Sequence, residues 1–291
     1  MPRSTLHAPA LEWYERHARD LPWRGPEATP WGVLVSEIML QQTPVARVLP
    51  VYVEWLARWP RPADLAAESP GEAVRMWGRL GYPRRALRLH EAAGVMVCLY
   101  GGAVPSSYNE LLALPGVGSY TAAAVASFAF GGRHAVLDTN VRRVLARAVS
   151  GQEQPPPHLS TAERGLADLL VPDEPAVAAR WAVAVMELGA LVCTARDPRC
   201  LDCPLVTQCA WRGNGQPAYE GPRRSPQGFA GTDRQVRGLI MAVLRDAPDA
   251  VPPAALDAVW SESEQRGRAL AGLVADGLVV SLDDGRFALP G

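Results

Sequence analysis

Residues 114–118 read Leu-Pro-Gly-Val-Gly and separate two segments whose apolar residues have the spacing of helices. Two glycines one residue apart permit a tight turn whose amide groups point outward at the start of the second helix. Such a turn can bind a phosphate through oriented dipoles, without a side-chain cation. Gly116, Val117 and Gly118 are therefore candidate phosphate-binding residues, and an ordinary turn between two helices is the alternative.

The chain on both sides of this turn is predicted to be almost entirely helical up to residue 211. It shows no alternation of apolar and polar residues typical of strands, and no internal repeat. Glycines and prolines interrupt the helical pattern, for example at residues 101–102, 131–132 and 154–158. We expect helices over residues 8–19, 30–40, 43–59, 64–67, 70–78, 84–99, 108–113, 119–130, 139–149, 160–170 and 175–191.

Residues 212–232 differ in composition from the rest, because eight of these 21 residues are Gly or Pro. Without apolar periodicity, the segment is interpreted as a linker. Residues 233–291 follow it, with three short helices expected over residues 233–246, 253–260 and 263–275. A predicted hairpin then joins residues 278–281 and 286–289, so this last part resembles a winged-helix domain.

The composition is that of a globular protein that lies outside membranes. The chain has 291 residues, 48% hydrophobic and 20% charged, which excludes disorder as the main theme. The longest apolar stretch, residues 176–193, contains Arg180 and Glu187 and is therefore interpreted as a buried helix and not a membrane span. The polar N-terminus lacks the apolar core of a signal peptide, so a cytoplasmic location is expected.

The charge is close to neutral overall but unevenly distributed. Between residues 75 and 147 there are nine arginines and three acids, in a chain whose formal net charge is −1. This predicts a face that binds a polyanion, with Arg142 and Arg143 as candidate phosphate ligands, although a solvated basic surface is the alternative. All 29 basic residues are Arg, so a mechanism with a lysine Schiff base is excluded, leaving only the N-terminal amine as a substitute.

Four cysteines directly after a predicted long helix indicate a metal centre. They are Cys193, Cys200, Cys203 and Cys209, with the spacing C-x6-C-x2-C-x5-C. A zinc ribbon usually presents two C-x2-C pairs and fits poorly, whereas an iron–sulfur cluster with four cysteine ligands fits better. Zinc and disulfides are the alternatives. The fifth cysteine, Cys98, lies in an apolar helix and is expected to be an inert core residue.

Two carboxyl groups have environments that suit acid–base chemistry. Glu37 shares a helix flank with Val33, Leu34 and Leu40, so its carboxyl is expected to be desolvated and to hold a proton near neutral pH. The alternative is a partly exposed helix acid. Asp138 precedes a basic helix, and an N-cap carboxylate is expected to be held ionised by amides and the helix dipole. One neutral and one charged carboxyl is the division used in glycosidic bond cleavage.

These motifs, in this order along residues 8–211, resemble those of the helix-hairpin-helix DNA glycosylases. The shared motifs are Glu37-x-Met39-Leu40-Gln41-Gln42-Thr43, Leu80-Gly81-Tyr82, residues 114–118, Leu137-Asp138-x-Asn140-Val141 and the four cysteines. Leu21-Pro22-Trp23-Arg24, together with the Gln-Gln-Thr run, is similar specifically to the MutY-type adenine DNA glycosylases.

The resemblance implies a mainly α, two-lobed fold with a six-helix barrel and a second lobe that carries a [4Fe–4S] cluster. The corresponding ranges are residues 23–134 for the barrel lobe, and residues 1–22 with 135–211 for the cluster lobe. The implied activity is a base excision repair hydrolysis of the N-glycosidic bond of adenine mispaired with 8-oxoguanine or guanine. The partner is double-stranded DNA from which the adenine is flipped, and a monomer is expected.

The resemblance also implies a role for each matching residue. Glu37 corresponds to the acid that protonates adenine N7, and Asp138 to the carboxylate that stabilises or transiently captures the sugar cation. Tyr120 and Asn140 correspond to residues that support this pair. Arg19, Trp23, Leu40 and Glu187 match the adenine pocket, and Gln42 and Tyr82 match wedge residues near the opposite base. Plain core packing is the alternative for Trp23, Leu40 and Tyr82.

Position 120 separates two branches of this superfamily. The branch that cleaves the strand has a lysine two residues after Gly118, and here that residue is Tyr120. A monofunctional glycosylase without Schiff-base lyase activity is therefore expected. A thymine or uracil mismatch glycosylase of the same superfamily is one alternative, and a non-catalytic iron–sulfur protein that binds DNA or senses redox state is another.

Residues 233–291 lie outside the resemblance. Many MutY-type enzymes carry a MutT-like C-terminal domain that reads 8-oxoguanine, and 59 residues are too few for that fold. The segment has few basic residues, and Asp283 and Asp284 would give an acidic wing. Contact with DNA and a packing or protein-interaction role are both open for it.

Overall fold

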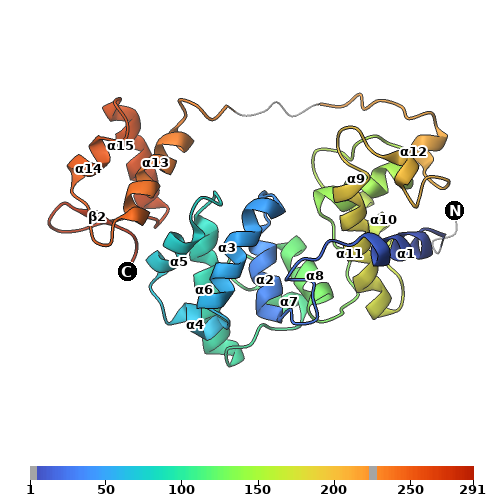
Figure 1. Ribbon diagram of the computed structural model, residues 1–291, viewed down its shortest axis with the longest axis horizontal. Helices are drawn as coiled ribbons and strands as arrows, with labels where there is room; N and C mark the ends of the chain where they lie inside the picture. The colour runs from blue at the N-terminus through green and yellow to red at the C-terminus, as the bar shows by residue number, and fades with distance from the viewer. Residues whose placement is uncertain (1–4, 223–227) are drawn as a thin grey trace. The chain divides into compact units, whose positions relative to one another are not determined.

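The computed structural model describes residues 5–222 and 228–291 and divides the chain into two compact units (Figure 1). The cysteine unit comprises residues 1–33, 106–113 and 117–224, and the tryptophan unit comprises residues 34–105, 114–116 and 225–291. Within the predicted lobes and linker, residues 1–4 and 223–227 lie outside the described residues. The predicted lobe boundaries place residues 23–33, 106–113 and 117–134 in the other lobe, and they stay predictions.

The cysteine unit is built from helices around a core of buried aliphatic and tryptophan side chains. Trp13, Trp181, Val185 and Leu188 are buried in this core, which lies between α1, α9 and α11. The helices of this unit are α1 (His7–His17), α7 (Tyr108–Leu112), α8 (Ser119–Phe128), α9 (Thr139–Ala148), α10 (Thr161–Leu170), α11 (Pro175–Leu191), the 3-10 helix η2 (Cys200–Asp202) and α12 (Ala210–Gly213).

The tryptophan unit takes its name from three buried tryptophans that pack edge to face. The ring centroid of Trp55 lies 4.7 Å from that of Trp59 and 5.7 Å from that of Trp77. These rings join α3 (Val45–Arg58) to α5 (Pro70–Trp77). The other helices before the linker are α4 (Pro62–Ala66) and α6 (Arg84–Tyr100), while α2 (Pro30–Met39) begins in the cysteine unit and ends in this one.

The C-terminal domain (residues 233–291) is the last part of the tryptophan unit. It contains α13 (Asp233–Asp246), α14 (Pro253–Asp257) and α15 (Ser263–Ala275), followed by β1 (Val280–Ser281) and β2 (Phe287–Ala288). The two strands pair antiparallel with Val280 opposite Ala288, and Val251 adds a bridge to Phe287. Three helices and a hairpin were predicted here, and the structure confirms them.

The helix boundaries follow from local chemistry visible in the sequence. Ser160 caps α10 and forms a capping box with Glu163, as its S-x-x-E spacing predicts. Ser69 caps α5, whose first residue is Pro70. The helices of the structure confirm the mainly helical prediction. No described helix is long and apolar enough to cross a membrane.

Candidate active site and cysteine cluster

Glu37 lies on α2, where residues 31–39 are all buried. The side chain is 5% exposed, and Val33, Leu34 and Ile38 around it are exposed by 3% or less. The predicted apolar surroundings of this carboxyl are confirmed, and the partly exposed alternative is excluded. A carboxyl withdrawn from water in this way is suited to general acid catalysis.

The turn after α2 is fixed by Arg85, a residue that sequence reasoning did not select. Its Nη1 donates to the backbone oxygens of Ile38 and Met39 at 3.0 Å each and of Gln41 at 2.5 Å. Its Nη2 donates to Thr43 Oγ1 at 3.0 Å. One guanidinium therefore holds the carboxyl end of the helix that carries Glu37.

The same guanidinium holds the loop before α6. Its Nη2 donates to the Gly81 backbone oxygen at 2.9 Å, and its Nε to that of Tyr82 at 3.4 Å. Gln42 and Tyr82 have φ angles of 54° and 49°, in the left-handed region that side chains disfavour. Tyr82 is 52% exposed, which excludes core packing for it. The structure thus tethers both candidate wedge residues to one side chain.

Asp138 lies at the N-cap of α9, as predicted. Its Oδ1 accepts from the Val141 backbone N–H at 2.6 Å, and its Oδ2 accepts from Asn140 Nδ2 at 2.8 Å. Burial raises the pKa of Asp138, although the hydrogen bonds from Val141 and Asn140 lower it. Desolvation therefore has a larger effect on this pKa than the N-cap hydrogen bonds. The expectation that the carboxylate is ionised stays a prediction.

Arg142 and Arg143 follow Asp138 on α9, and both have partners inside the cysteine unit, while their assignment to phosphate stays a prediction. Arg142 forms an ion pair with Glu163 at 2.9 Å and donates to the Pro156 backbone oxygen at 2.7 Å. Arg143 is 8% exposed and donates to Asn140 Oδ1 at 2.8 Å and to the backbone oxygens of residues 139, 189 and 193. Their guanidinium groups donate hydrogen bonds to residues of the cysteine unit. The number of charges in the segment could not reveal these contacts.

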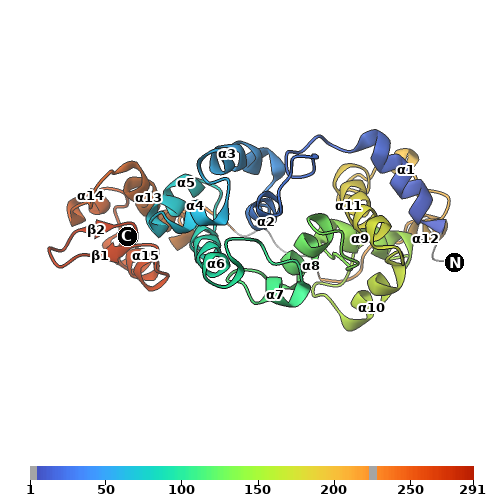
Figure 2. The same ribbon diagram turned by 90° about the horizontal axis from the view of Figure 1, so that it is seen from below.

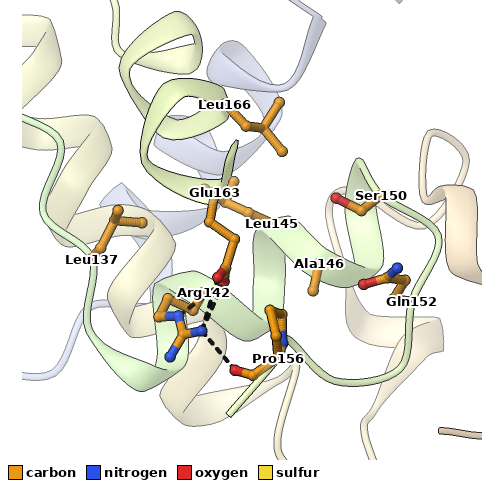
Figure 3. Close-up of a pocket in the computed structure, with 9 residues that line it drawn as sticks. All are labelled: Leu137, Arg142, Leu145, Ala146, Ser150, Gln152, Pro156, Glu163 and Leu166. Carbon is orange, nitrogen blue, oxygen red and sulfur yellow. Dashed lines mark hydrogen bonds and ion pairs between the residues drawn. The ribbon is translucent and has the colours of Figure 1, made fainter. Parts of the chain in front are cut away.

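A small cavity lies beside the ion pair of Arg142 and Glu163 (Figure 3). Leu137, Leu145, Pro156 and other side chains line it, and its volume is about 30 Å³. That volume suits a single water molecule and not a nucleobase. The cavity is therefore part of the packing between α9 and α10.

Arg19 and Glu187, two predicted residues of the adenine pocket, contact each other. Glu187 is fully buried, and its two oxygens accept from Arg19 Nε at 2.7 Å and Arg19 Nη2 at 2.8 Å. Arg24 Nη1 also donates to Glu187, at 2.8 Å. Burial raises the pKa of Glu187, but the hydrogen bonds and charges of both arginines lower it to about 2. Trp23, which lies between Arg19 and Arg24 in the sequence, is buried. Leu40, in the tryptophan unit, is half-buried.

The turn of residues 114–118 has the geometry that its glycines predict. Gly116 has a φ of +77°, and a Cβ there would lie 2.7 Å from the Arg88 Cβ, so glycine is required. Gly118 is the N-cap of α8, without a side-chain cap and with open space around its Cα. The Val117 side chain is buried, so only its backbone can face a ligand. Phosphate binding at these amides stays a prediction.

Tyr120 lies on the first turn of α8, directly after this glycine turn. The side chain is half-buried and packs against a small cluster that includes Ala124, Val136 and Ala182. The structure therefore places Tyr120 directly after the glycine turn, at the start of α8. Its contribution to catalysis stays a prediction.

Two of the four cysteines, Cys193 and Cys209, contact Arg147 of α9. Burial raises the pKa of Cys203 to about 12, and the charges of Cys193, Cys209 and Cys200 raise it further. Arg147 Nη1 donates to Cys193 Sγ at 3.5 Å, and Gln216 Nε2 donates to Cys200 Sγ at 3.8 Å. Among the described residues, no three His, Cys, Asp or Glu side chains are close enough to hold one metal ion.

The spacing of the four cysteines in the sequence predicts a cluster in place of a single ion, and the bound group stays a prediction. Each cysteine of a four-iron cluster binds a different iron, so the sulfurs stand farther apart than ligands of one ion. Donors from Arg147 and Gln216 toward sulfur suit the negative charge of thiolates and sulfides. Arg147 is 2% exposed, also donates to the Thr194 oxygen at 2.8 Å, and lies over the Trp211 ring at 4.7 Å. It fastens the cysteine segment to α9.

The comparisons with known proteins agree with this site. Residues 35–167 match the family model described as HhH-GPD superfamily base excision DNA repair protein. The chain is 52% identical to the adenine DNA glycosylase of Mycobacterium tuberculosis (strain ATCC 25618 / H37Rv), covering 100% of this chain and 95% of that protein. The chain belongs to the adenine DNA glycosylase family of the HhH-GPD superfamily.

Other relatives match a smaller share of this chain. The adenine DNA glycosylase of Homo sapiens is 43% identical over 69% of this chain and 38% of its own length. The structure of a thermostable thymine-DNA glycosylase has a TM-score of 0.65 and 30% identity, covering 73% of this chain and 97% of that one. The mycobacterial relative therefore matches a larger share of this chain than either of these two proteins does.

Sequence reasoning on this family member missed Arg24, Arg85 and Arg147. Arg24 stands in the quoted Leu-Pro-Trp-Arg motif, but its contact with Glu187 joins residues far apart in the chain. One expectation about Cys98 was also wrong, because this cysteine is exposed on α6. The apolar residues beside it include Leu99, which is 72% exposed, so an apolar stretch of helix did not imply burial.

Proposed function

We propose that this protein is a monofunctional DNA glycosylase of base excision repair. It hydrolyses the N-glycosidic bond of adenine mispaired with 8-oxoguanine or guanine. The observation that carries the proposal is the burial of Glu37 among apolar side chains of α2. The 52% identity over the whole chain to an adenine DNA glycosylase supports the choice of base.

The chemistry assigned to the two carboxyl groups is an acid-assisted departure of the base. Glu37 delivers its proton to N7 of the flipped adenine, and the bond from N9 to the sugar C1′ breaks with its electron pair on the base. Asp138 then faces the positive sugar, and water adds to C1′ and returns a proton to the Glu37 carboxylate, which leaves an abasic site. A carboxylate that is poorly solvated beforehand gains more from a nearby positive charge, which suits the raised pKa of Asp138.

The residues around this pair are assigned to binding and orientation. Asn140 holds Asp138 through its hydrogen bond, and Tyr120 supports the pair from the start of α8. Arg19, Trp23, Leu40 and Glu187 form the adenine pocket in this proposal. Gln42 and Tyr82 act as wedges beside the opposite base, and the amides of Gly116, Val117 and Gly118 hold a phosphate.

We also propose that Cys193, Cys200, Cys203 and Cys209 hold a [4Fe–4S] cluster. The group would supply a covalent fastening of residues 193–209, and redox chemistry if it is accessible to a partner. The protein acts as a monomer on double-stranded DNA, in the cytoplasm where the nucleoid lies.

The first test is a single-turnover cleavage assay on four otherwise identical duplexes, followed by alkaline strand scission. They contain A:8-oxoguanine, A:G, T:G and U:G. Excision of adenine, with breaks only after alkali, supports the proposal and also the absence of a lyase step. Efficient borohydride trapping of the protein on DNA would contradict the assignment of Tyr120.

A thymine mismatch glycosylase is the second candidate, because the matching thermostable enzyme is named a thymine-DNA glycosylase. Excision of thymine or uracil in the same assay would favour it and remove the adenine pocket assigned above. A non-catalytic DNA-binding or redox-sensing protein would cleave none of the four duplexes. The variant Asp138→Asn distinguishes an enzyme from such a non-catalytic protein, since only an enzyme loses excision while its duplex affinity stays intact.

A further inference from the structure

The C-terminal domain contacts the rest of the tryptophan unit on both sides of the loop that carries Tyr82. This loop, residues 78–83, connects the end of α5 to the start of α6. In Figure 2, α13 of the C-terminal domain lies beside α5. Three groups of polar contacts fasten the two parts, and each is described in turn below.

The first contact joins Arg75 on α5 to the carboxyl end of α13. Its Nη1 donates to the Ala247 backbone oxygen at 2.8 Å and also to that of Arg245. In return, Arg245 Nε donates to the Val74 backbone oxygen at 3.1 Å. A guanidinium at a helix C-terminus satisfies carbonyls that have no partner in the helix and complements its dipole. The exchange is reciprocal, so it fixes orientation as well as distance.

The second contact is a close approach of two backbones near the start of α5. The Gly71 N–H donates to the Pro290 backbone oxygen at 2.8 Å. A Cβ at position 71 would lie 2.5 Å from that oxygen and 3.0 Å from the Leu289 Cβ. Only glycine fits here without displacement, and this explains a glycine inside a helix where it costs conformational entropy.

The third contact is at the other end of the loop. Arg84, the first residue of α6, forms an ion pair with Asp276 at 3.2 Å. Asp276 follows α15 and also pairs with Arg237 of α13. An exposed pair of this kind contributes little stability by itself, but it adds a tether two residues after Tyr82.

The loop between these contacts has a backbone that needs external support. Gly78, Gly81 and Tyr82 all have positive φ angles, of 54°, 84° and 49°. A tyrosine in this region persists only when its surroundings hold it there. Arg85 holds the loop on the side of α2, and the C-terminal domain holds the two helices that bound it.

The charge of the C-terminal domain argues against a second function in DNA contact. It has six arginines and nine acids. Among its described arginines, Arg237, Arg266, Arg268 and Arg286 pair with acids of the same domain. Such a domain repels phosphates more than it attracts them.

We propose that the C-terminal domain positions the Tyr82 loop and thereby sets the preference for the base opposite adenine, without itself binding DNA. The part of this inference that concerns the base opposite adenine rests on the proposed function. Its physical part, the support of the loop, rests only on the contacts of Gly71, Arg75 and Arg84.

Two variants with matched controls test the proposal in the full-length protein. Gly71→Ala inserts a methyl group against Pro290, whereas Gly94→Ala adds the same group on α6 where nothing lies within 4 Å. Arg75→Gln removes the guanidinium at α13, whereas Arg61→Gln removes another arginine that also pairs with an acid three residues away. The readouts are hydrogen exchange of the peptide spanning residues 78–84, and the ratio of single-turnover rates on A:8-oxoguanine and A:G duplexes.

We expect both test variants to raise exchange in this peptide and to change the rate ratio by about fivefold, as for residues coupled by contact. Both controls should match the wild type. Unchanged exchange in both test variants would overturn the positioning role, and raised exchange with an unchanged ratio would overturn the role in specificity. If the wild type excises no adenine, the proposed function fails, while exchange still decides whether the domain supports the loop.

Discussion

The side-chain amide of Asn140 lies between Asp138 and Arg143 and bonds to both at 2.8 Å. Its nitrogen donates to Asp138 Oδ2, and its oxygen accepts from Arg143 Nη2. Arg143 in turn donates to the Cys193 backbone oxygen at 2.7 Å. The orientation of the carboxylate assigned to the sugar cation therefore depends on residues along α9 and on the cysteine segment behind it.

The first prediction concerns Asp138→Asn. Asn caps a helix as well as Asp does, so α9 should keep its start. Because the pKa of Asp138 is raised, its ionised form costs folding free energy above the ordinary carboxyl pKa, and this cost disappears in acid. We expect an equal or higher Tm at pH 7, no gain at low pH, and excision about 100-fold slower or worse. Thermal unfolding at several pH values and single-turnover kinetics measure both effects.

Asp168→Asn is the matched control, because it removes a charge from an exposed position of the same unit. It should leave the excision rate unchanged. A clearly lower Tm for Asp138→Asn at pH 7 would contradict the view that this carboxylate is held at a cost.

A second prediction concerns Arg85→Lys. Lysine keeps the charge but cannot reach the oxygens of Ile38, Gln41, Thr43 and Gly81 at the same time. We expect a loss of about 2 kcal/mol in the free energy of unfolding, and slower excision on A:8-oxoguanine. Denaturant titration and single-turnover kinetics check this. Arg61→Lys is the control because that side chain is 74% exposed. An equal loss of stability and of excision rate in the two variants would contradict the role of Arg85 in holding the two turns.

The third prediction uses the pKa of about 2 at Glu187. A carboxyl whose folded pKa is depressed stabilises the fold above its unfolded pKa, near 4.3, and loses this contribution as the pH falls toward 2. Glu187→Gln should unfold more easily than the wild type at pH 7, by about 3 kcal/mol, because Arg19 and Arg24 lose their partner. The difference should shrink between pH 4.5 and 2. A gap that stays constant over this interval would show that the carboxylate charge is not its source.

A fourth prediction separates the clustered cysteines from the remaining one. Cys203→Ser should purify without iron and without visible absorbance, and residues 192–211 should become sensitive to proteolysis. Cys98→Ser, an exposed cysteine on α6, should keep both iron and resistance. Iron content, visible spectra and protease mapping decide the outcome. Stoichiometric zinc in the wild type, or no metal at all, would contradict the cluster.

Much of the fold followed from local signals in the sequence. The capping box at Ser160, the prolines that begin α5 and α11, and the three helices with a hairpin after residue 233 are read from neighbouring residues. The burial of Glu37 followed likewise, since Val33, Leu34 and Leu40 share its helix flank.

Other parts of the site could not be predicted because they depend on contacts between distant segments. Arg142 and Arg143 were assigned to phosphate from the charge of their segment, yet each also has partners among residues 156–193, far along the chain. Arg85 looked like one more basic residue, although it binds six acceptors on two turns. The pKa of Asp138 depends on burial by the surrounding fold, which its N-cap position does not reveal.

The left-handed backbones of Gln42 and Tyr82 also bear on how this lineage changes over generations. Glycine or asparagine would relieve the conformational cost at either position, so selection for folding alone would replace both side chains. If both side chains persist over generations, that persistence indicates a demand for activity and not for folding. In a descendant released from repair, positions 42 and 82 should be among the first to drift, before the buried tryptophans and before the cysteines. The two residues can thus serve as a marker that distinguishes working copies of the gene from decaying ones.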